Sequence, residues 1–392
     1  MSVLTETERV HLTDMNIAIW GTGTFGRYIE QQLRKRINYC IRYFIDSNAA
    51  LWGQEINGSE IISPKRLAEV SGEELDFVLV AFMNGIEIYQ PLLEMHIIKF
   101  GIVWNRVFEA QMQLEDDLLQ DRNIVWSDAR YLDKPILRSL ETNIVDDCNL
   151  NCKGCSHFSN LFEHGAGVPF EVYCRDLKQV AEHVYIHQFN MLGGEAILHP
   201  RMIEYIEYTR KLLPNSDIEI ISNGLLIPKQ TEAFFRCCAE NDITISISGY
   251  KPTLQIKDKI RTVLDKYHIA AIFREEVIEF RKCIDLSASA DKRESVHKCY
   301  ANRCNFLRYG KIYKCPFEAL GNYFFEYFDL DIRLDGGIDI FDENMDWMAL
   351  AERLARIYEP VDACRYCGDE KKIAWEVSMF PSLEDWVVRK AP

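Results

Sequence analysis

The sequence lacks any run of roughly 18 apolar residues, so it predicts no membrane-spanning helix. It also lacks a basic excess, because 60 aspartates and glutamates outnumber 45 lysines and arginines and give a net charge of −15. No basic patch stands out, which argues against nucleic acid or an acidic membrane surface as a partner. The polar residues 1–10 have no apolar core of the kind that signal peptides carry. We therefore expect a cytoplasmic protein.

Cysteine, by contrast, is abundant, with 13 in 392 residues. In a chain without a secretion signal, this number indicates metal ligands in a reducing compartment rather than disulfides. The length allows two or three domains. We predict a first domain at 1–112, a charged linker with one short helix at 113–138, a core at 139–290, and a C-terminal domain followed by a C-terminal helix at 291–392.

The most informative stretch is Cys148-Asn-Leu-Asn-Cys152-Lys-Gly-Cys155, directly after an extended run at 140–145. Thiolates are soft ligands that select zinc, copper(I) or iron–sulfur clusters. A structural zinc site normally takes four protein ligands, and this loop offers three, since His157 lies too close to Cys155 to be a good fourth. Three thiolates suit a four-iron cluster whose remaining iron stays open to a small chelating ligand.

Strands and helices alternate from residue 139 onward, which predicts a parallel sheet curled into a partial barrel. The sequence gives no clear place for a sixth strand. Helices are expected at 170–184, 201–213, 229–240 and 258–267, and strands at 186–192, 217–222, 243–248 and 269–273.

Three further motifs end the predicted strands that follow the cysteine loop, namely Met191-Leu-Gly193-Gly194-Glu195, Ser222-Asn223-Gly224 and Ser246-Ile-Ser248. Together with the CxxxCxxC spacing, and in the same order, these motifs resemble those of the radical S-adenosylmethionine (radical SAM) superfamily, over about residues 138–370. In α/β sheets, ligands bind outside the carboxyl ends of the strands, where all four motifs are expected to lie.

The resemblance implies an α/β fold: a radical SAM partial (β/α)6 barrel, with a Rossmann-like domain before it and a small cysteine-rich domain after it. It implies an enzyme that cleaves S-adenosylmethionine at a [4Fe–4S] cluster to a 5′-deoxyadenosyl radical, which then abstracts a hydrogen atom from a substrate. It assigns the cluster to Cys148, Cys152 and Cys155. It assigns S-adenosylmethionine contacts to Gly193, Gly194, Glu195, Ser222, Asn223, Ser246 and Ser248, although the two last serines could merely end a strand.

One position departs from the family pattern. Many members carry an aromatic residue just before the third cysteine, where it packs near the adenine, and here that residue is Gly154. The neighbouring Phe158 is the candidate substitute.

A second cysteine group follows the core, and Phe306-Leu-Arg-Tyr-Gly310-Lys-Ile-Tyr313 within it predicts a hairpin. The group could bind zinc, and it also resembles the short auxiliary-cluster extension of the superfamily, which holds one extra [4Fe–4S] cluster. The firmer ligand candidates are Cys315, Cys364 and Cys367, and we prefer Cys304 over Cys299 as the fourth. Cys283 and Cys299 are candidate hydrogen-atom donors, with a small buried apolar role as the alternative.

The N-terminal segment predicts a strand at 15–20, the turn Gly21-Thr-Gly23-Thr-Phe-Gly26, a helix at 27–35 and a strand at 41–45 that ends at Asp46. This is a GxGxxG turn in strand–helix context, whose glycines let a backbone approach a pyrophosphate. Binding of NAD, binding of a nucleotide or nucleotide-sugar, and a purely structural role all remain open. The segment also resembles a small domain attached to sugar-modifying transferases.

These observations together favour a radical SAM enzyme acting on a small molecule, a carbohydrate or nucleotide-linked sugar, by epimerisation, dehydration or dehydrogenation. The resemblance implies flavodoxin or ferredoxin as the electron donor. The alternatives are modification of a ribosomally made peptide, and a non-catalytic binding protein stabilised by zinc.

Overall fold

The computed structural model describes residues 15–34, 40–82, 85–97, 99–103, 124–126 and 134–389. The chain divides into two compact units, residues 1–136 and 137–392. The polar start at 1–10 and most of the expected linker at 113–138 lie outside the described residues. The described parts of that linker include strand β7 and the beginning of strand β8. No helix in the described ranges is long and apolar enough to cross a membrane.

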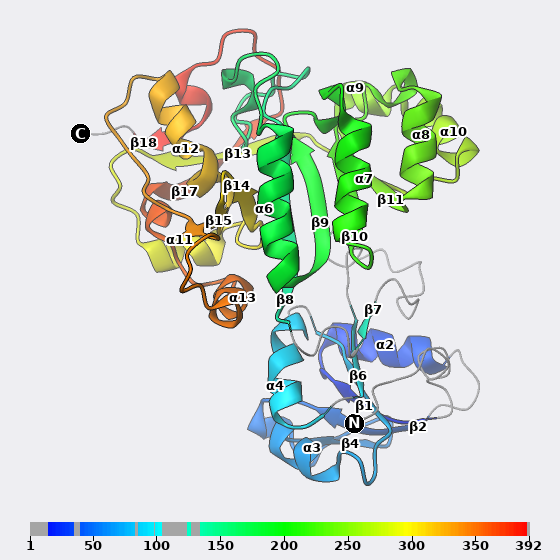
Figure 1. Ribbon diagram of the computed structural model, residues 1–392. Helices are drawn as coiled ribbons and strands as arrows, with labels where there is room; N and C mark the ends of the chain where they lie inside the picture. Colours follow the sequence, from blue (N-terminus) through cyan, green and yellow to red (C-terminus); the bar gives the residue numbers. More distant parts are fainter. Residues whose placement is uncertain are drawn as a thin grey trace. The chain divides into compact units, whose positions relative to one another are not determined.

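The first unit is built on a mostly parallel seven-stranded sheet in the order β3-β4-β2-β1-β5-β6-β7. Its strands are β1 Asn16–Trp20, β2 Cys40–Ile45, β3 Glu55–Ile56, β4 Ser59–Ile62, β5 Phe77–Val80, β6 Phe100–Val103 and β7 Ile124–Trp126. Its helices are α2 Thr24–Arg34, α3 Pro64–Val70 and α4 Tyr89–Glu94, with α2 on the opposite side of the sheet from α3 and α4 (Figure 1).

Alternation along β1 explains this layering, because successive side chains of a strand point to opposite faces. Ile17 and Ile19 pack in one core with Phe25 and Ile29 of α2. Ala18 and Trp20 pack in the other core, which α3 and α4 cover. All four β1 side chains are buried, as expected for a central parallel strand.

The second unit contains an eight-stranded sheet in the order β12-β11-β10-β9-β8-β14-β15-β16. Its strands are β8 Ile136–Val145, β9 Tyr185–Gly193, β10 Asp217–Ser222, β11 Ile243–Gly249, β12 Ala271–Glu276, β14 Phe306–Arg308, β15 Lys311–Tyr313 and β16 Ile338–Asp339. The pairs β9–β10, β10–β11 and β11–β12 are parallel, and so is β8–β14, whereas β14–β15–β16 run antiparallel. This mixed α/β architecture agrees with the expected partial barrel with added segments.

Helices cover one face of this sheet (Figure 1). They are α6 Phe170–His183, α7 Met202–Leu212, α8 Glu232–Glu240 and α10 Lys257–Lys266, with the short α9 Lys251–Leu254 before α10. Strand residues such as Leu140, Phe189 and Ile245 pack against them in the main core. The alternate residues of the strands therefore face the opposite side, where the barrel interior lies.

The C-terminal part adds helices α11 Lys292–Lys298, α12 Pro316–Tyr327 and α13 Trp347–Ala355, and a separate sheet in the order β17-β13-β18. The strands of that sheet are β13 Glu279–Asp285, β17 Cys367–Ala374 and β18 Val387–Arg389. The strand after β12 thus leaves the main sheet, and the predicted hairpin, β14–β15, pairs beside β8 instead. The sequence could not place a sixth strand because these pairings join segments far apart in the chain.

A buried ion pair joins the end of β8 to this hairpin. Arg308 Nη1 and Nη2 donate to Asp146 Oδ1 and Oδ2 at 3.0 and 2.8 Å, and the two side chains are only 3% and 2% exposed. Asn143 also donates to Asp146, at 2.8 Å, and its amide oxygen lies 3.1 Å from Nδ1 of His157 in the cysteine loop. A bidentate pair of this kind is among the strong hydrogen-bonded contacts.

We expect Arg308→Met to lower the free energy of unfolding of the second unit by about 3–5 kcal/mol, because it leaves the Asp146 carboxylate buried without its counter-charge. Urea unfolding measures the loss. Adding Asp146→Leu should recover part of it, and a double variant as unstable as the sum of the single losses would contradict the pairing.

The glycines of the N-terminal turn offer a second, matched test. A Cβ on Gly21, whose φ is +130°, would lie 2.4 Å from the Ala81 carbonyl oxygen, whereas a Cβ on Gly23 would meet nothing within 4 Å. Gly21→Ala should destabilise the first unit by about 1–3 kcal/mol or more from backbone strain, and Gly23→Ala should change stability little. Urea unfolding of both variants compares them; equal losses would contradict this division of roles.

Candidate active site

Cys148, Cys152 and Cys155 line one cavity of about 160 Å³ at the carboxyl ends of the parallel strands. The motif residues that follow β9, β10 and β11 reach the same cavity, as expected for an α/β sheet. The lining also includes Gly193, Gly194, Ser222, Asn223, Ser248, Tyr250 and Phe280. The structure therefore brings together eight of the ten residues assigned to the cluster and S-adenosylmethionine, while Glu195 and Ser246 do not line the cavity.

Each of the three cysteine sulfurs has at least one polar neighbour, and Cys148 Sγ also lies 3.9 Å from Asn149 Oδ1. Asn223 Nδ2 lies 3.7 Å from Cys148 Sγ, Trp375 Nε1 lies 3.2 Å from Cys152 Sγ, and Ser159 Oγ lies 3.8 Å from Cys155 Sγ. Burial raises the pKa of the Cys148 and Cys152 thiols to about 12. These thiols would stay protonated without a cation, and metal coordination is the ordinary way to deprotonate them.

Gly193 and Gly194 must be glycines because the backbone of residues 145–147 lies very close to both of them. A Cβ on Gly193 would lie 1.9 Å from the Val145 carbonyl oxygen, and one on Gly194 would lie 2.0 Å from that of Asp147. This contact presses the end of β9 against the start of the cysteine loop. Their predicted approach to a ligand stays a prediction.

Glu195 lies behind the cavity wall and is fully buried. Its carboxylate accepts hydrogen bonds from the Ser222 hydroxyl at 2.8 Å and from the Asn223 backbone N–H at 2.7 Å. Burial raises its pKa to about 7. In this arrangement Glu195 ties the ends of β9 and β10 together, and its predicted contact with the methionine ammonium group stays a prediction.

The two serines of β11 differ in position. Ser248 lines the cavity, whereas Ser246 is fully buried and accepts a hydrogen bond from Arg274 Nε at 2.9 Å. On the same inner face, burial raises the pKa of Glu141 to about 7, and its carboxylate hydrogen-bonds with Asn190 and Cys304. The interior of the barrel is thus polar.

The departure at Gly154 has a structural reason. Its φ is +66°, and an added Cβ would lie 3.0 Å from the Asp385 carbonyl oxygen and 3.1 Å from Ile373 Cδ1, so no aromatic side chain fits. Phe158 does not take over that place, because it is 2% exposed and packs with Phe324 and Trp386 in a C-terminal core.

A second cavity, of about 120 Å³ and largely apolar, is lined by five cysteines of the C-terminal region, Cys283, Cys299, Cys304, Cys315 and Cys367. Burial raises the pKa of Cys299 and Cys315, and Cys364, which lies outside this lining, adds to the rise. Across the described residues, no three histidine, cysteine or carboxylate side chains converge as ligands of a single metal ion.

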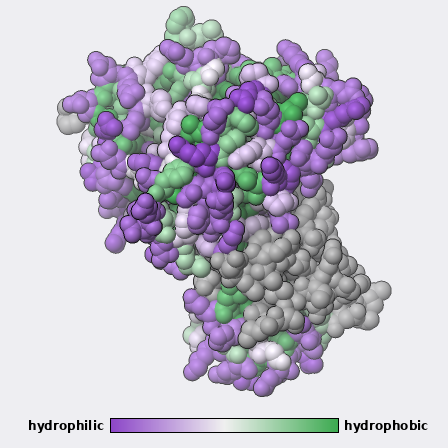
Figure 2. Space-filling model, viewed as in Figure 1, coloured by the Kyte–Doolittle hydropathy of each residue, from purple (hydrophilic) through white to green (hydrophobic). Residues whose placement is uncertain are grey.

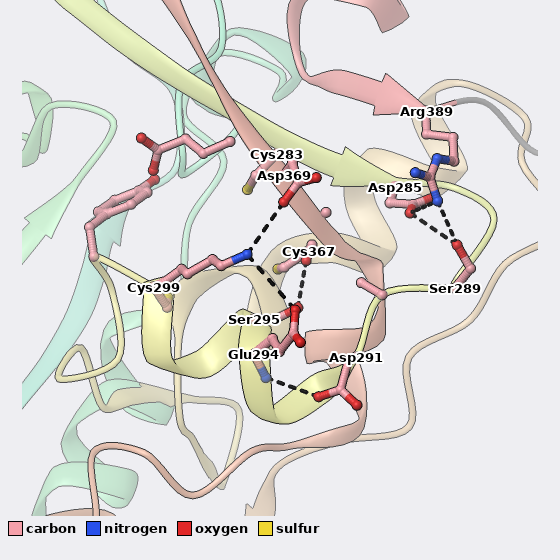
Figure 3. Close-up of a pocket in the computed structure, with 15 residues that line it drawn as sticks. Cys283, Asp285, Ser289, Asp291, Glu294, Ser295, Cys299, Cys367, Asp369 and Arg389 are labelled. Atoms are coloured by element: carbon pink, nitrogen blue, oxygen red, sulfur yellow. Dashed lines mark hydrogen bonds and ion pairs between the residues drawn. The ribbon is translucent and has the colours of Figure 1, made fainter.

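Figure 3 shows Cys283, Cys299 and Cys367 on the wall of a neighbouring pocket of about 240 Å³. Cys283 sits where the β13–β17 register shifts, since Lys282 pairs with Lys371 but Ile284 already pairs with Cys367. This irregularity brings the two thiols into hydrogen-bonding contact, which lowers the pKa of Cys283 and raises that of Cys367. Neither proposed hydrogen-atom donor, Cys283 nor Cys299, lines the first cavity.

In the first unit, Gly21 and Gly23 lie between β1 and α2 as predicted, whereas Gly26 lies within the first turn of α2, which begins at Thr24 and not at residue 27. Thr22 Oγ1 donates to Asp46 Oδ2, and the Asn48 backbone N–H donates to Asp46 Oδ1 at 2.8 Å. A Cβ on Gly26 would lie 1.9 Å from the Gly21 carbonyl oxygen, so this glycine serves the turn itself. Ligand binding by Gly21, Gly23, Gly26 and Asp46 stays a prediction.

Three aromatic residues at the first cavity or beside it were not found from the sequence, namely Tyr250 and Phe280 in its lining and Trp375 beside Cys152. Tyr250 lines it, and Trp375 stacks on Tyr250 with ring centroids 5.3 Å apart. Tyr250 follows β11 directly, so its position was a usable signal. Trp375 lies more than two hundred residues beyond the cysteine loop, and no local pattern marks it.

Comparison with known families gives two matches. Residues 142–278 match the family described as the radical SAM superfamily, and residues 13–103 match one described as C2185-like, N-terminal. The first match spans the cysteine loop and the motifs of β9, β10 and β11.

Curated relatives include two GTP 3′,8-cyclases. The one from Microcystis aeruginosa (strain NIES-843 / IAM M-2473) is 25% identical over 118 residues, which cover 29% of this chain and 35% of the relative. The one from Alkaliphilus oremlandii (strain OhILAs) is 25% identical over 126 residues, covering 32% and 37%. The chain spans little more than a third of the length of these relatives.

Similar solved structures include BtrN in complex with AdoMet and 2-DOIA, at 12% identity and a TM-score of 0.39, covering 60% of this chain and 94% of that one. UDP-D-quinovosamine 4-dehydrogenase from Vibrio fischeri is 21% identical with a TM-score of 0.21, covering 24% and 81%. These scores are low, so the assignment rests on the family match and the cysteine loop. Residues 142–278 of this chain therefore form a radical SAM domain.

Proposed function

We propose that this chain is an S-adenosylmethionine-cleaving enzyme whose [4Fe–4S] cluster is held by Cys148, Cys152 and Cys155. The observation that carries the proposal is that these three thiols line one cavity together with the Gly193–Gly194 loop. A set of three thiols fits a cluster with one open iron. When bound, the cluster and S-adenosylmethionine supply reductive bond cleavage and hydrogen-atom abstraction.

The chain's own residues supply binding and shielding. Asn223 and Ser248 present polar groups to the cavity, and Tyr250 and Phe280 present aromatic surface there. We infer that these two rings provide the adenine contact that neither Gly154 nor Phe158 can make. Because Glu195 fixes Ser222 and the Asn223 backbone, it positions the loop that faces the methionine end of S-adenosylmethionine.

We infer the substrate class from the polar inner face of the sheet. Glu141, Asn190, Ser246 and Arg274 carry hydrogen-bonding groups there. These groups support a hydroxyl-rich small molecule, which we propose is a carbohydrate or nucleotide-linked sugar changed by epimerisation, dehydration or dehydrogenation. A cytoplasmic location and reduction by flavodoxin or ferredoxin belong to the same proposal.

An auxiliary [4Fe–4S] cluster at Cys299, Cys315, Cys364 and Cys367 is a further part of the proposal. Burial raises the pKa of Cys299 and Cys315, and the nearby Cys364 adds to the rise. The hydrogen bond with Cys283 and burial raise the pKa of Cys367, and Cys315 and Cys299 add to that rise. Cys304 lines the same cavity and also lies near Cys315 and Cys299, but it hydrogen-bonds with Glu141 as well. This hydrogen bond favours Cys299 over Cys304 as the fourth ligand, the reverse of the preference from sequence.

The zinc-stabilised alternative fits less well. Four thiolates around one zinc ion lie about 3.8 Å apart. In the described ranges no three such groups are gathered around a single-ion position. We also propose that residues 139–290 form the catalytic core and residues 291–392 the auxiliary-cluster domain.

Reductive cleavage is tested by anaerobic reconstitution, reduction with dithionite and mass-spectrometric detection of 5′-deoxyadenosine. The wild-type chain should form it, and Cys152→Ala should form none, because its cavity loses one of three cluster ligands. Product from the variant at the wild-type rate would contradict the assigned ligands. Candidate sugars should raise the yield above the substrate-free level, and a rise with a peptide instead would overturn the substrate class.

The ligand choice is tested by a matched pair of variants. Reconstituted wild type should contain about eight irons per chain, Cys299→Ala about four, and Cys304→Ala about eight, as iron analysis would measure. The reverse outcome, with iron lost from Cys304→Ala alone, would restore the preference made from sequence.

A further inference from the structure

The segment after β17 lies directly against the cysteine loop (Figure 1). The Lys153 backbone N–H donates to the Glu376 carbonyl at 2.9 Å, and the Ser378 N–H donates to the Asn151 carbonyl at 2.9 Å. Lys153 Nζ also pairs with Glu376 Oε2 at 2.8 Å. Two backbone hydrogen bonds on either side of Cys152 hold the segment in register with the loop.

Trp375 begins this segment and reaches a cysteine sulfur. Its indole Nε1–H donates to Cys152 Sγ at 3.2 Å, which is shorter than the side-chain contacts of the Cys148 and Cys155 sulfurs. The ring is fixed from its other side, because it stacks on Tyr250 with an interplanar angle of 29°. The contact is therefore part of a packed arrangement and not a chance orientation of a free side chain.

A second tryptophan makes a contact of a different kind with the same loop. Trp386 Nε1–H donates to the Cys155 backbone carbonyl at 2.8 Å, and its ring packs on Phe324 and Phe328 in the C-terminal core. It supports the loop without touching a sulfur. Trp386 therefore contacts only the loop backbone, whereas Trp375 donates a hydrogen bond to the sulfur of a proposed cluster ligand.

A hydrogen bond to a cluster-ligating sulfur stabilises the more electron-rich state, because the reduced cluster places more negative charge on its sulfurs. Reduction potentials of iron–sulfur clusters depend on such bonds. Removing the donor should destabilise the reduced state and make the potential more negative.

We propose that Trp375 is a positioning residue that donates to the Cys152 sulfur and raises the reduction potential of the cluster. This inference rests on the proposed function, since it requires a cluster at Cys148, Cys152 and Cys155. It gives the C-terminal segment a role in the redox chemistry of a site formed more than two hundred residues earlier.

The test compares Trp375→Phe with Trp386→Phe in the reconstituted full chain. Both changes keep an aromatic ring and remove an indole N–H, but only the first removes a donor to sulfur. Iron analysis first establishes loading, and a potentiometric titration followed by electron paramagnetic resonance gives the midpoint potential of each cluster.

We expect Trp375→Phe to lower the ratio of reduced to oxidised cluster at a fixed potential by about tenfold, which is about 59 mV for a one-electron couple. Trp386→Phe should leave that ratio at the wild-type value. An unchanged potential in a loaded Trp375→Phe variant overturns the inference and leaves the proposed function intact. A wild-type chain that binds no iron at the loop overturns the proposed function itself.

A second measurement needs no variant and covers the case in which Trp375→Phe fails to fold. Wild type grown with tryptophan labelled with ¹⁵N at the indole nitrogen should show a ¹⁵N hyperfine coupling in the reduced cluster. The Trp386→Phe protein, labelled in the same way, should keep it. Absence of the coupling in loaded wild type would contradict the hydrogen bond.

Discussion

The buried ion pair between Asp146 and Arg308 is the contact on which the active-site region depends. Asp146 ends the strand that carries the cysteine loop, and Arg308 belongs to the hairpin that pairs beside that strand. Both charged side chains are almost fully buried, so removal of one would leave the other buried without a counter-charge, at a large cost in stability. Asn143 extends the network to His157 within the loop itself. Arg308, from the C-terminal third of the chain, therefore helps to fix the conformation of the cysteine loop through Asp146 and Asn143.

The cysteine loop also contacts the C-terminal segment that follows β17. Trp375 contacts a sulfur, Trp386 contacts a backbone carbonyl, and the strand-like contact around Cys152 joins the two segments. This packing leaves no room for a side chain at Gly154, which is why the loop lacks the aromatic residue common in the superfamily. The C-terminal region thus packs against the cysteine loop and also forms its own cysteine-lined cavity.

The fold gives the C-terminal cysteines different hydrogen-bonding partners, although their side chains are chemically identical. Their order in the sequence leaves five candidates for four positions. The register shift opposite Cys283 brings it to Cys367, and the partner of Cys304 is Glu141 on the inner face of the barrel. Cys304 lines the same cavity as Cys299, Cys315 and Cys367, but it alone among these thiols hydrogen-bonds with Glu141, and strand pairing places it there. The polar inner face that receives Cys304 is also the part of the barrel that supports a hydrophilic substrate.

The sequence by itself determined the alternation of strands and helices, the spacing of Cys148, Cys152 and Cys155, and the placement of the motifs at strand ends. These are local patterns, read within a few residues, and the carboxyl edge of a parallel sheet then gathers them. Only the tertiary structure decided that the strand after β12 leaves the sheet, that Arg308 pairs with Asp146, and that Trp375 reaches Cys152. Each of these contacts joins segments separated by about ninety residues or more, and no local periodicity encodes such a pairing. The choice depends on which edge and which face remain free once the rest of the chain has packed.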